Sequence, residues 1–326
     1  MNAIASRIQE LQQYSPARTA APDLDSFWQR TCKEARDLPF RAEKELQPTL
    51  IQGMSVYAVS FDSFGETRIS GRLIVPQATN DGRSGTRFPC VTVFPGYTNA
   101  MDHHAAYAHW TMMGVAVLAL DVRGQAGESG NRLGSDYGMT KGWITEGILD
   151  PHSCYYKALA IDAWRALEWV SVQPEIDASR IAAVGASQGG GLALLAAALH
   201  SKVSLAVADI PNMCHMDFGI LHSTGSLTEA AEFCRKHPAQ TEAVLRTLSY
   251  FDMLNLAARV NVPLLMSVGL KDSVCMPEQI FPVYERIASA DKQLAIYPFT
   301  GHAVETDQWD KMLRFVHDKF DLSAAG

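Results

Sequence analysis

Three short apolar segments constrain the fold of this chain more than any other feature. They are CVTVFP (90–95), VAVLALD (115–121) and RIAAVGA (180–186), and each is bounded by turn-forming residues. Such continuous apolar runs suit parallel strands that are buried on both faces. From about residue 55 onward, strands of this kind alternate with helical segments. This alternation predicts an α/β fold, with a central sheet covered by helices on both faces.

Five further segments complete a predicted, mostly parallel sheet of about eight strands. Two of them, joined by the turn DSFGE, are expected to form an antiparallel edge hairpin, 55–61 with 69–76. The other three strands are expected at 203–210, 263–270 and 293–299. Helices are expected at 105–113, 155–172, 189–200, 277–288 and 306–320.

Two regions interrupt this alternation. Residues 1–48 contain an amphipathic segment, DLDSFWQRTCKEARDL, which predicts an N-terminal helical arm. Residues 212–250 form a long polar and helical insertion between two strands, at a point where such sheets tend to carry a lid over the site. We expect the whole chain, 1–326, to form a single domain.

Composition and charge indicate which kinds of binding partner and cofactor the chain can be expected to have. The chain has 326 residues and a formal net charge of −7, which argues against nucleic-acid binding and favours a small neutral or polar substrate. No stretch predicts a signal peptide or a membrane span, so a cytoplasmic protein is expected. The six scattered cysteines form no CxxC pair, which favours reduced thiols and no metal site. No glycine-rich phosphate-binding loop is found, and no cofactor is expected.

The stretch Gly185-Ala186-Ser187-Gln188-Gly189 matches the nucleophile motif G-x-S-x-G. A buried strand precedes it and an apolar helix follows it, as that motif requires. The small flanking residues suit a cramped strand-to-helix turn that raises the serine hydroxyl above the sheet edge. Glycines 189–191 are expected to leave room for a small acyl group. The alternative interpretation is a purely structural Gly-Ser turn.

A serine nucleophile needs a base, and the base needs an orienting acid. His302 follows the strand 293–299 and Asp272 follows the strand 263–270, in the chain order Ser, Asp, His. Both lie just past the C-terminal ends of their strands, where such sheets build their sites. Asp209 and Asp307 are competing candidates for the acid.

Two backbone N–H groups are expected to form an oxyanion hole. Gln188 follows the nucleophile, and Tyr97 lies in the loop PGYTNA after the strand 90–95. The sequence is equally compatible with Tyr97 as a packed aromatic residue. Arg123 follows another strand end, where a structural ion pair is favoured over binding of a substrate carboxylate.

Taken together, these pieces resemble the acetyl xylan esterase and cephalosporin C deacetylase family, carbohydrate esterase family 7. The resemblance covers nearly the whole chain and is carried by RGQ (123–125), GASQGGGLALLAAAL (185–199) and YPFTGH (297–302), and by the segments 147–170 and 250–277. It implies an α/β-hydrolase fold, a serine esterase that deacetylates acetylated xylo-oligosaccharides or cephalosporin C, no metal, and a homo-hexamer. It also implies Ser187, Asp272 and His302 as the triad, Tyr97 and Gln188 as oxyanion donors, and Arg123 and Gln125 as structural or substrate-loop residues.

The chain departs from the family pattern at two motifs. The family usually has HGY where this chain has Pro95-Gly96-Tyr97, and His-Glu where this chain has His302-Ala303. These changes leave the triad intact but leave acyl preference and assembly open. A short-chain carboxylesterase, a dienelactone-type hydrolase, a peptidase and a non-catalytic binding protein are the alternative functions.

Overall fold

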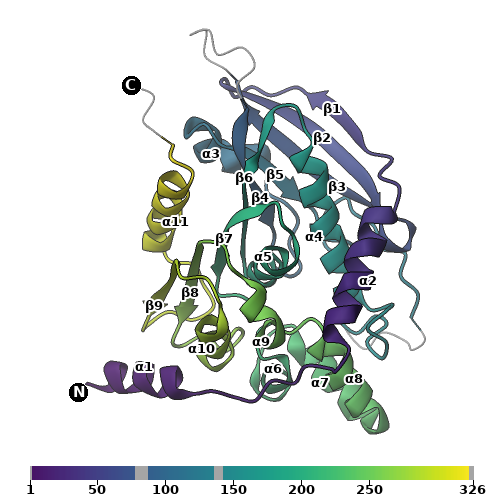
Figure 1. Cartoon of the computed structure of the whole chain (residues 1–326), viewed down its shortest axis with the longest axis vertical. Helices are drawn as coiled ribbons and strands as arrows, with labels where there is room; N and C mark the ends of the chain where they lie inside the picture. The colour runs from purple at the N-terminus through teal and green to yellow at the C-terminus, as the bar shows by residue number, and fades with distance from the viewer. Residues whose placement is uncertain (1, 78–86, 136–141, 323–326) are drawn as a thin grey trace.

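The computed structural model describes residues 2–77, 87–135 and 142–322, and within these ranges one mixed sheet has nine strands (Figure 1). The strand order is β1-β2-β3-β5-β4-β6-β7-β8-β9. Strands β1 to β3 and the β3–β5 pair are antiparallel, whereas β5, β4 and β6 to β9 are mutually parallel. The strands are β1 (Glu43–Gln47), β2 (Met54–Ser63), β3 (Thr67–Pro76), β4 (Phe88–Phe94), β5 (Ala116–Leu120), β6 (Ile176–Ala186), β7 (Val203–Asp209), β8 (Leu264–Gly269) and β9 (Lys292–Tyr297).

The described ranges contain eleven α-helices, which include the five that the sequence predicted from residue 105 onward. They are α1 (Ala3–Gln13), α2 (Leu24–Asp37), α3 (Ala108–Met112), α4 (Tyr155–Ser171), α5 (Gln188–Leu199), α6 (Met216–His222), α7 (Leu227–Lys236), α8 (Thr241–Ser249), α9 (Met253–Leu256), α10 (Pro277–Arg286) and α11 (Thr306–Lys319). Among the described residues, none of these helices is long and apolar enough to cross a membrane.

The sheet separates two apolar cores because successive side chains of a strand point to opposite faces. Val117 and Leu118 of β5 belong to different clusters, the first with Trp110 of α3 and Phe315 of α11, the second with Leu159 of α4 and the residues of α5. Helices α3 and α11 therefore cover one face, and α4 and α5 cover the other (Figure 1). The prediction of a mostly parallel sheet with helices on both faces is confirmed.

One strand was not predicted. The segment EKELQ of β1 carries charged, largely exposed side chains and pairs with β2 through its backbone, with Leu46 opposite Tyr57. Such a strand lacks the apolar pattern by which strands are found in a sequence. The hairpin of β2 and β3 forms as expected, but β1 and not β2 is the edge of the sheet.

The N-terminal arm is fixed to the rest of the chain at both of its helices. In α2, Trp28 is buried and its Nε1–H donates to the Tyr250 carbonyl oxygen at 3.0 Å. The unpredicted helix α1 lies beside α10 (Figure 1), where Arg7 forms an ion pair with Glu278. The arm thus packs against α4 through α2 and against α10 through α1.

The insertion 212–250 contains α6, α7 and α8. The turn after α6 contacts the loop after β8: the Ser223 hydroxyl donates to the Val274 carbonyl at 2.7 Å, and the Thr224 N–H donates to the Ser273 carbonyl at 2.9 Å. The insertion is therefore packed against the loop that carries Asp272.

Arg123, in the loop after β5, is fully buried and links three elements. Its Nε and Nη2 donate to the two carboxylate oxygens of Asp162 on α4, each at 2.6 Å, and its Nη1 donates to the Phe64 carbonyl at 3.1 Å. This two-point geometry satisfies both charges inside the protein. The predicted ion pair is present, and the guanidinium is not exposed to a substrate.

We predict that Arg123→Ala lowers the free energy of unfolding by about 3–5 kcal/mol, because it leaves the Asp162 carboxylate buried without its cation. Urea unfolding followed by circular dichroism measures this change. Lys33→Ala is the control, since Lys33 pairs with Asp37 on the exposed face of α2 and its loss should cost less than about 0.5 kcal/mol. An equal decrease in the free energy of unfolding in the two variants would show that the buried Arg123–Asp162 pair contributes no more than the exposed one.

Candidate active site

Ser187 lies at the turn between β6 and α5 in a conformation that few residues adopt. Its φ is 56° and its ψ is −119°. Two backbone hydrogen bonds hold it there: its N–H donates to the Asp209 carbonyl at 2.9 Å, and its carbonyl accepts from the Asn212 N–H at 2.9 Å. A strained residue of this kind persists only where its surroundings fix it. The partly exposed side chain stands at the N-terminus of α5, where helix dipoles favour negative charge.

The three glycines after Gln188 allow α5 to pack directly on the strand ends. A Cβ at Gly189 would lie 1.9 Å from the Phe94 carbonyl oxygen, and one at Gly190 would lie 2.8 Å from that of Asp209. The space beside these residues is filled by backbone atoms. The expectation that they leave room for an acyl group was therefore wrong, and their role is close helix–sheet packing.

The structure brings Ser187, His302 and Asp272 together in one hydrogen-bonded chain. His302 Nε2 lies 3.0 Å from Ser187 Oγ, and His302 Nδ1 lies 2.8 Å from Asp272 Oδ2. The other carboxylate oxygen of Asp272 accepts from the N–H groups of Val274 at 2.7 Å and Cys275 at 3.0 Å. The acid is buried and immobilised, while the base is partly exposed at the surface where a substrate would arrive.

The two competing acids are engaged elsewhere. Asp209 is buried and accepts from Gln308 Nε2 at 2.7 Å, and burial raises its pKa to about 6. Asp307 lies at the start of α11 and pairs with Lys311 at 2.6 Å. Asp272 is the acid whose carboxylate reaches the imidazole of His302.

The two expected oxyanion donors come from the first residue of α5 and from the turn after β4. Gln188 is the first residue of α5, and an N–H group in that position has no acceptor within its own helix. Tyr97 is the second residue of a turn closed by the Asn99 N–H and the Gly96 carbonyl at 3.1 Å, so the turn leaves the Tyr97 N–H unused. The fold thus supplies two backbone donors without a partner in their own elements.

The Gln125 side chain links the turn that contains Tyr97 to the first residue of α5. Its Oε1 accepts from the Thr98 N–H at 2.8 Å, and its Nε2 donates to Gln188 Oε1 at 3.0 Å and to the Tyr155 hydroxyl at 2.9 Å. The Gln125 side chain is fully buried. A single buried amide therefore sets the distance between the Tyr97 turn and α5.

The Tyr97 side chain makes contacts that sequence reasoning did not find. Its hydroxyl donates to the carboxylate of Glu229, with oxygen–oxygen distances of 2.8 and 2.9 Å, and accepts from the Trp143 N–H at 3.0 Å. Its ring meets the Trp143 indole edge to face, with centroids 5.6 Å apart. Glu229 lies on α7, 132 residues further along the chain, and a contact over this separation cannot be predicted from a local sequence pattern.

Within the described ranges, no three His, Cys, Asp or Glu side chains are grouped in a way that would hold a metal ion. Ser187 Oγ contacts the imidazole of His302, which Asp272 orients, and lies at the N-terminus of α5. This set suits nucleophilic acyl transfer.

Comparison with known proteins places this geometry in a family. A family model described as acetyl xylan esterase matches residues 1–319. The structure of acetyl xylan esterase from Paenibacillus sp. R4 superposes with a TM-score of 0.91 at 36% identity, over 95% of this chain and 99% of that one. Acetyl xylan esterase 1 from Thermoanaerobacterium sp. gives a TM-score of 0.89 at 27% identity, over 96% and 98% of the two chains. The superpositions confirm the predicted α/β-hydrolase fold.

A curated relative extends the comparison. Acetyl esterase Axe7A of Xylanibacter ruminicola is 24% identical over 286 residues, which are 86% of this chain. The match covers 63% of that relative, so the chain spans less than two thirds of its length.

We predict that Gln125→Ala lowers kcat for an acetyl ester about 10- to 100-fold, because the Tyr97 turn and α5 lose their common partner. The free energy of unfolding should fall by about 1–3 kcal/mol, since buried polar groups are left unpaired. Steady-state kinetics and urea unfolding measure both changes. Gln77→Ala, which removes an exposed amide at the end of β3, should change neither, and an unchanged kcat in Gln125→Ala would contradict this role.

Proposed function

Because the chain belongs to the acetyl xylan esterase family, we propose that it is a serine esterase that removes acetyl groups from small polar esters. The observation that carries this proposal is the hydrogen-bonded chain from Ser187 Oγ through His302 to Asp272, with distances of 3.0 and 2.8 Å. This arrangement activates a hydroxyl that is otherwise a weak nucleophile.

In the proposed acylation step, Ser187 Oγ attacks the ester carbonyl carbon while His302 Nε2 accepts the hydroxyl proton. Asp272 keeps the other imidazole nitrogen protonated and stabilises the imidazolium that forms. The carbonyl oxygen becomes an oxyanion, and the N–H groups of Tyr97 and Gln188 stabilise it. As the carbon–oxygen bond breaks, His302 returns the proton to the leaving alcohol and an acetyl-serine remains.

Deacylation repeats this chemistry with water as the nucleophile. His302 takes a proton from the water as it attacks the acetyl carbonyl, and the same two N–H groups hold the second oxyanion. Collapse of this intermediate releases acetate, and Ser187 Oγ recovers its proton from His302.

We propose acetylated xylo-oligosaccharides and cephalosporin C as substrates. The names of the Paenibacillus and Thermoanaerobacterium relatives support acetyl xylan as the substrate class. The alternative is another short-chain carboxylesterase, a dienelactone-type hydrolase or a peptidase on the same fold. Rates with acetyl, butyryl and peptide substrates separate these functions, and faster butyryl turnover would favour the alternative.

We also propose that the chain acts as one catalytic domain, with the arm 1–48 and the insertion 212–250 as its additions. Its assembly is proposed to be a homo-hexamer, by family resemblance, and its location the cytoplasm. The six unpaired cysteines are consistent with a reducing compartment. A monomer in sedimentation velocity would contradict the assembly.

The nucleophile is tested by Ser187→Ala, which we expect to lower the rate of p-nitrophenyl acetate hydrolysis by at least about 10³-fold. Removal of the oxygen leaves no atom that can form the acyl-enzyme. Initial rates of purified, folded variants measure the effect.

Cys275→Ala is the matched control. Cys275 Sγ lies 4.0 Å from Ser187 Oγ. Its thiol is the alternative nucleophile to be tested, because sulfur can form an acyl-enzyme as the serine oxygen does. Burial raises the pKa of this thiol, so it stays protonated, and its removal should leave most of the activity. Full activity in Ser187→Ala, or loss of activity only in Cys275→Ala, would show that the nucleophile is wrongly assigned.

A further inference from the structure

Glu229 is a buried carboxylate that the acyl-transfer chemistry does not use directly. It lies on α7 of the insertion and is 4% exposed. Both of its carboxylate oxygens lie within hydrogen-bond distance of the Tyr97 hydroxyl, at 2.8 and 2.9 Å. Hydrogen bonds to a charged acceptor are stronger than neutral ones. A residue from the insertion thus holds the side chain whose backbone N–H is an oxyanion donor.

The Tyr97 hydroxyl is fixed from two directions. It donates to Glu229 and accepts from the Trp143 N–H. Burial raises the pKa of Tyr97, and the nearby carboxylate raises it further, so the hydroxyl remains protonated and continues to donate. Gly142 packs directly against the Glu229 carboxylate, since a Cβ at this position would lie 2.0 Å from Glu229 Oε1. The loop before α4 and the helix α7 therefore meet at this one tyrosine.

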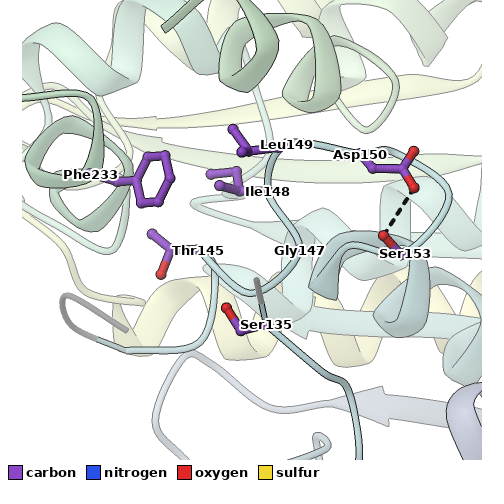
Figure 2. A pocket seen from close by; sticks show the side chains of 8 residues that line it. All are labelled: Ser135, Thr145, Gly147, Ile148, Leu149, Asp150, Ser153 and Phe233. Carbon is purple, nitrogen blue, oxygen red and sulfur yellow. Dashed lines mark hydrogen bonds between the residues drawn. The ribbon is translucent and has the colours of Figure 1, made fainter. Parts of the chain in front are cut away.

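A second buried side chain, one helical turn after Glu229, also fixes the position of α7. Phe233, four residues after Glu229, is 2% exposed and belongs to the main apolar core with Ile148. Figure 2 shows Phe233 in a small pocket that it lines together with Thr145 and Ile148. Residues four apart share one face of a helix. The face of α7 that packs on the loop before α4 is therefore the face that carries Glu229.

On these contacts, we propose that Glu229 is a positioning residue for catalysis: it anchors Tyr97 so that the Tyr97 N–H points at the developing oxyanion. The insertion thereby completes the oxyanion hole. This inference rests on the proposed esterase function. The Tyr97 N–H is the donor from a loop, whereas the Gln188 N–H is fixed by a helix, so the loop donor is the one that needs an anchor.

The test compares kcat and KM of Glu229→Ala, Glu229→Gln and Tyr97→Phe with p-nitrophenyl acetate. Glu229→Ala is expected to lower kcat about 10- to 100-fold and leave KM within about threefold, because the oxyanion exists only in the transition state. Glu229→Gln should recover much of this loss, since its amide oxygen still accepts from the hydroxyl. Tyr97→Phe keeps the backbone N–H but loses the anchor, and should resemble Glu229→Ala.

The double variant Glu229→Ala with Tyr97→Phe is expected to be no slower than either single variant, because both remove one interaction. Glu232→Ala is the control on the same helix, where Glu232 pairs with Lys236 at the surface, and it should keep the parental kcat. Parental kcat in Glu229→Ala, or additive losses in the double variant, would overturn the proposal.

The rate at which a fluorophosphonate labels Ser187, read by intact mass, separates this proposal from the esterase function. The phosphoryl oxygen also uses the oxyanion hole, so labelling should slow in Glu229→Ala by a factor similar to that of kcat. If the parent chain is labelled but hydrolyses no ester, the proposed esterase function is wrong. The ratio of labelling rates between Glu229→Ala and the parent then still tests whether Glu229 anchors Tyr97. Equal labelling rates in parent and Glu229→Ala would overturn the anchor alone.

Discussion

The site depends on the backbone of Ser187, which the fold holds at a φ of 56°. Two hydrogen bonds, to the Asp209 carbonyl and from the Asn212 N–H, fix this residue between the ends of β6 and β7. Such a conformation costs about 1–3 kcal/mol. The packing of Gly189 and Gly190 against the strand ends determines how α5 leaves the turn. The rigid sheet thus stores the strain that aims the serine hydroxyl at His302.

The remaining groups reach Ser187 from loops, and buried polar contacts hold those loops. Backbone N–H groups of Val274 and Cys275 fix Asp272, Gln125 fixes the turn of Tyr97 against α5, and Glu229 holds the Tyr97 hydroxyl. The contacts of Gln125 and Glu229 join segments that are distant in sequence, whereas those of Asp272 lie within its own loop. In a water-poor interior, an unpaired member of such a network would be costly, which is why these contacts favour one arrangement of the site.

Sequence reasoning found the parts of this protein that local patterns encode. Apolar runs identified the strands that carry Ser187, Asp272 and His302, and their positions after strand ends predicted that these residues meet. The strand β1 escaped prediction because its side chains are charged and its pairing is made by the backbone. The Glu229–Tyr97 contact escaped because it depends on how the insertion packs, a property of tertiary structure. The glycines after Gln188 were correctly placed on the helix but given the wrong role, since what a Cβ would meet there depends on the tertiary packing.

We conclude that Ser187 is a nucleophile because the native fold activates it through His302. Peptide mass mapping after reaction with a fluorophosphonate tests this most directly, with the parent compared with His302→Ala and with urea-unfolded chain. We expect one adduct, on Ser187, in the folded parent, and little or none in the other two samples. An adduct on another residue, or equal labelling of Ser187 in the folded parent and in His302→Ala, would contradict it.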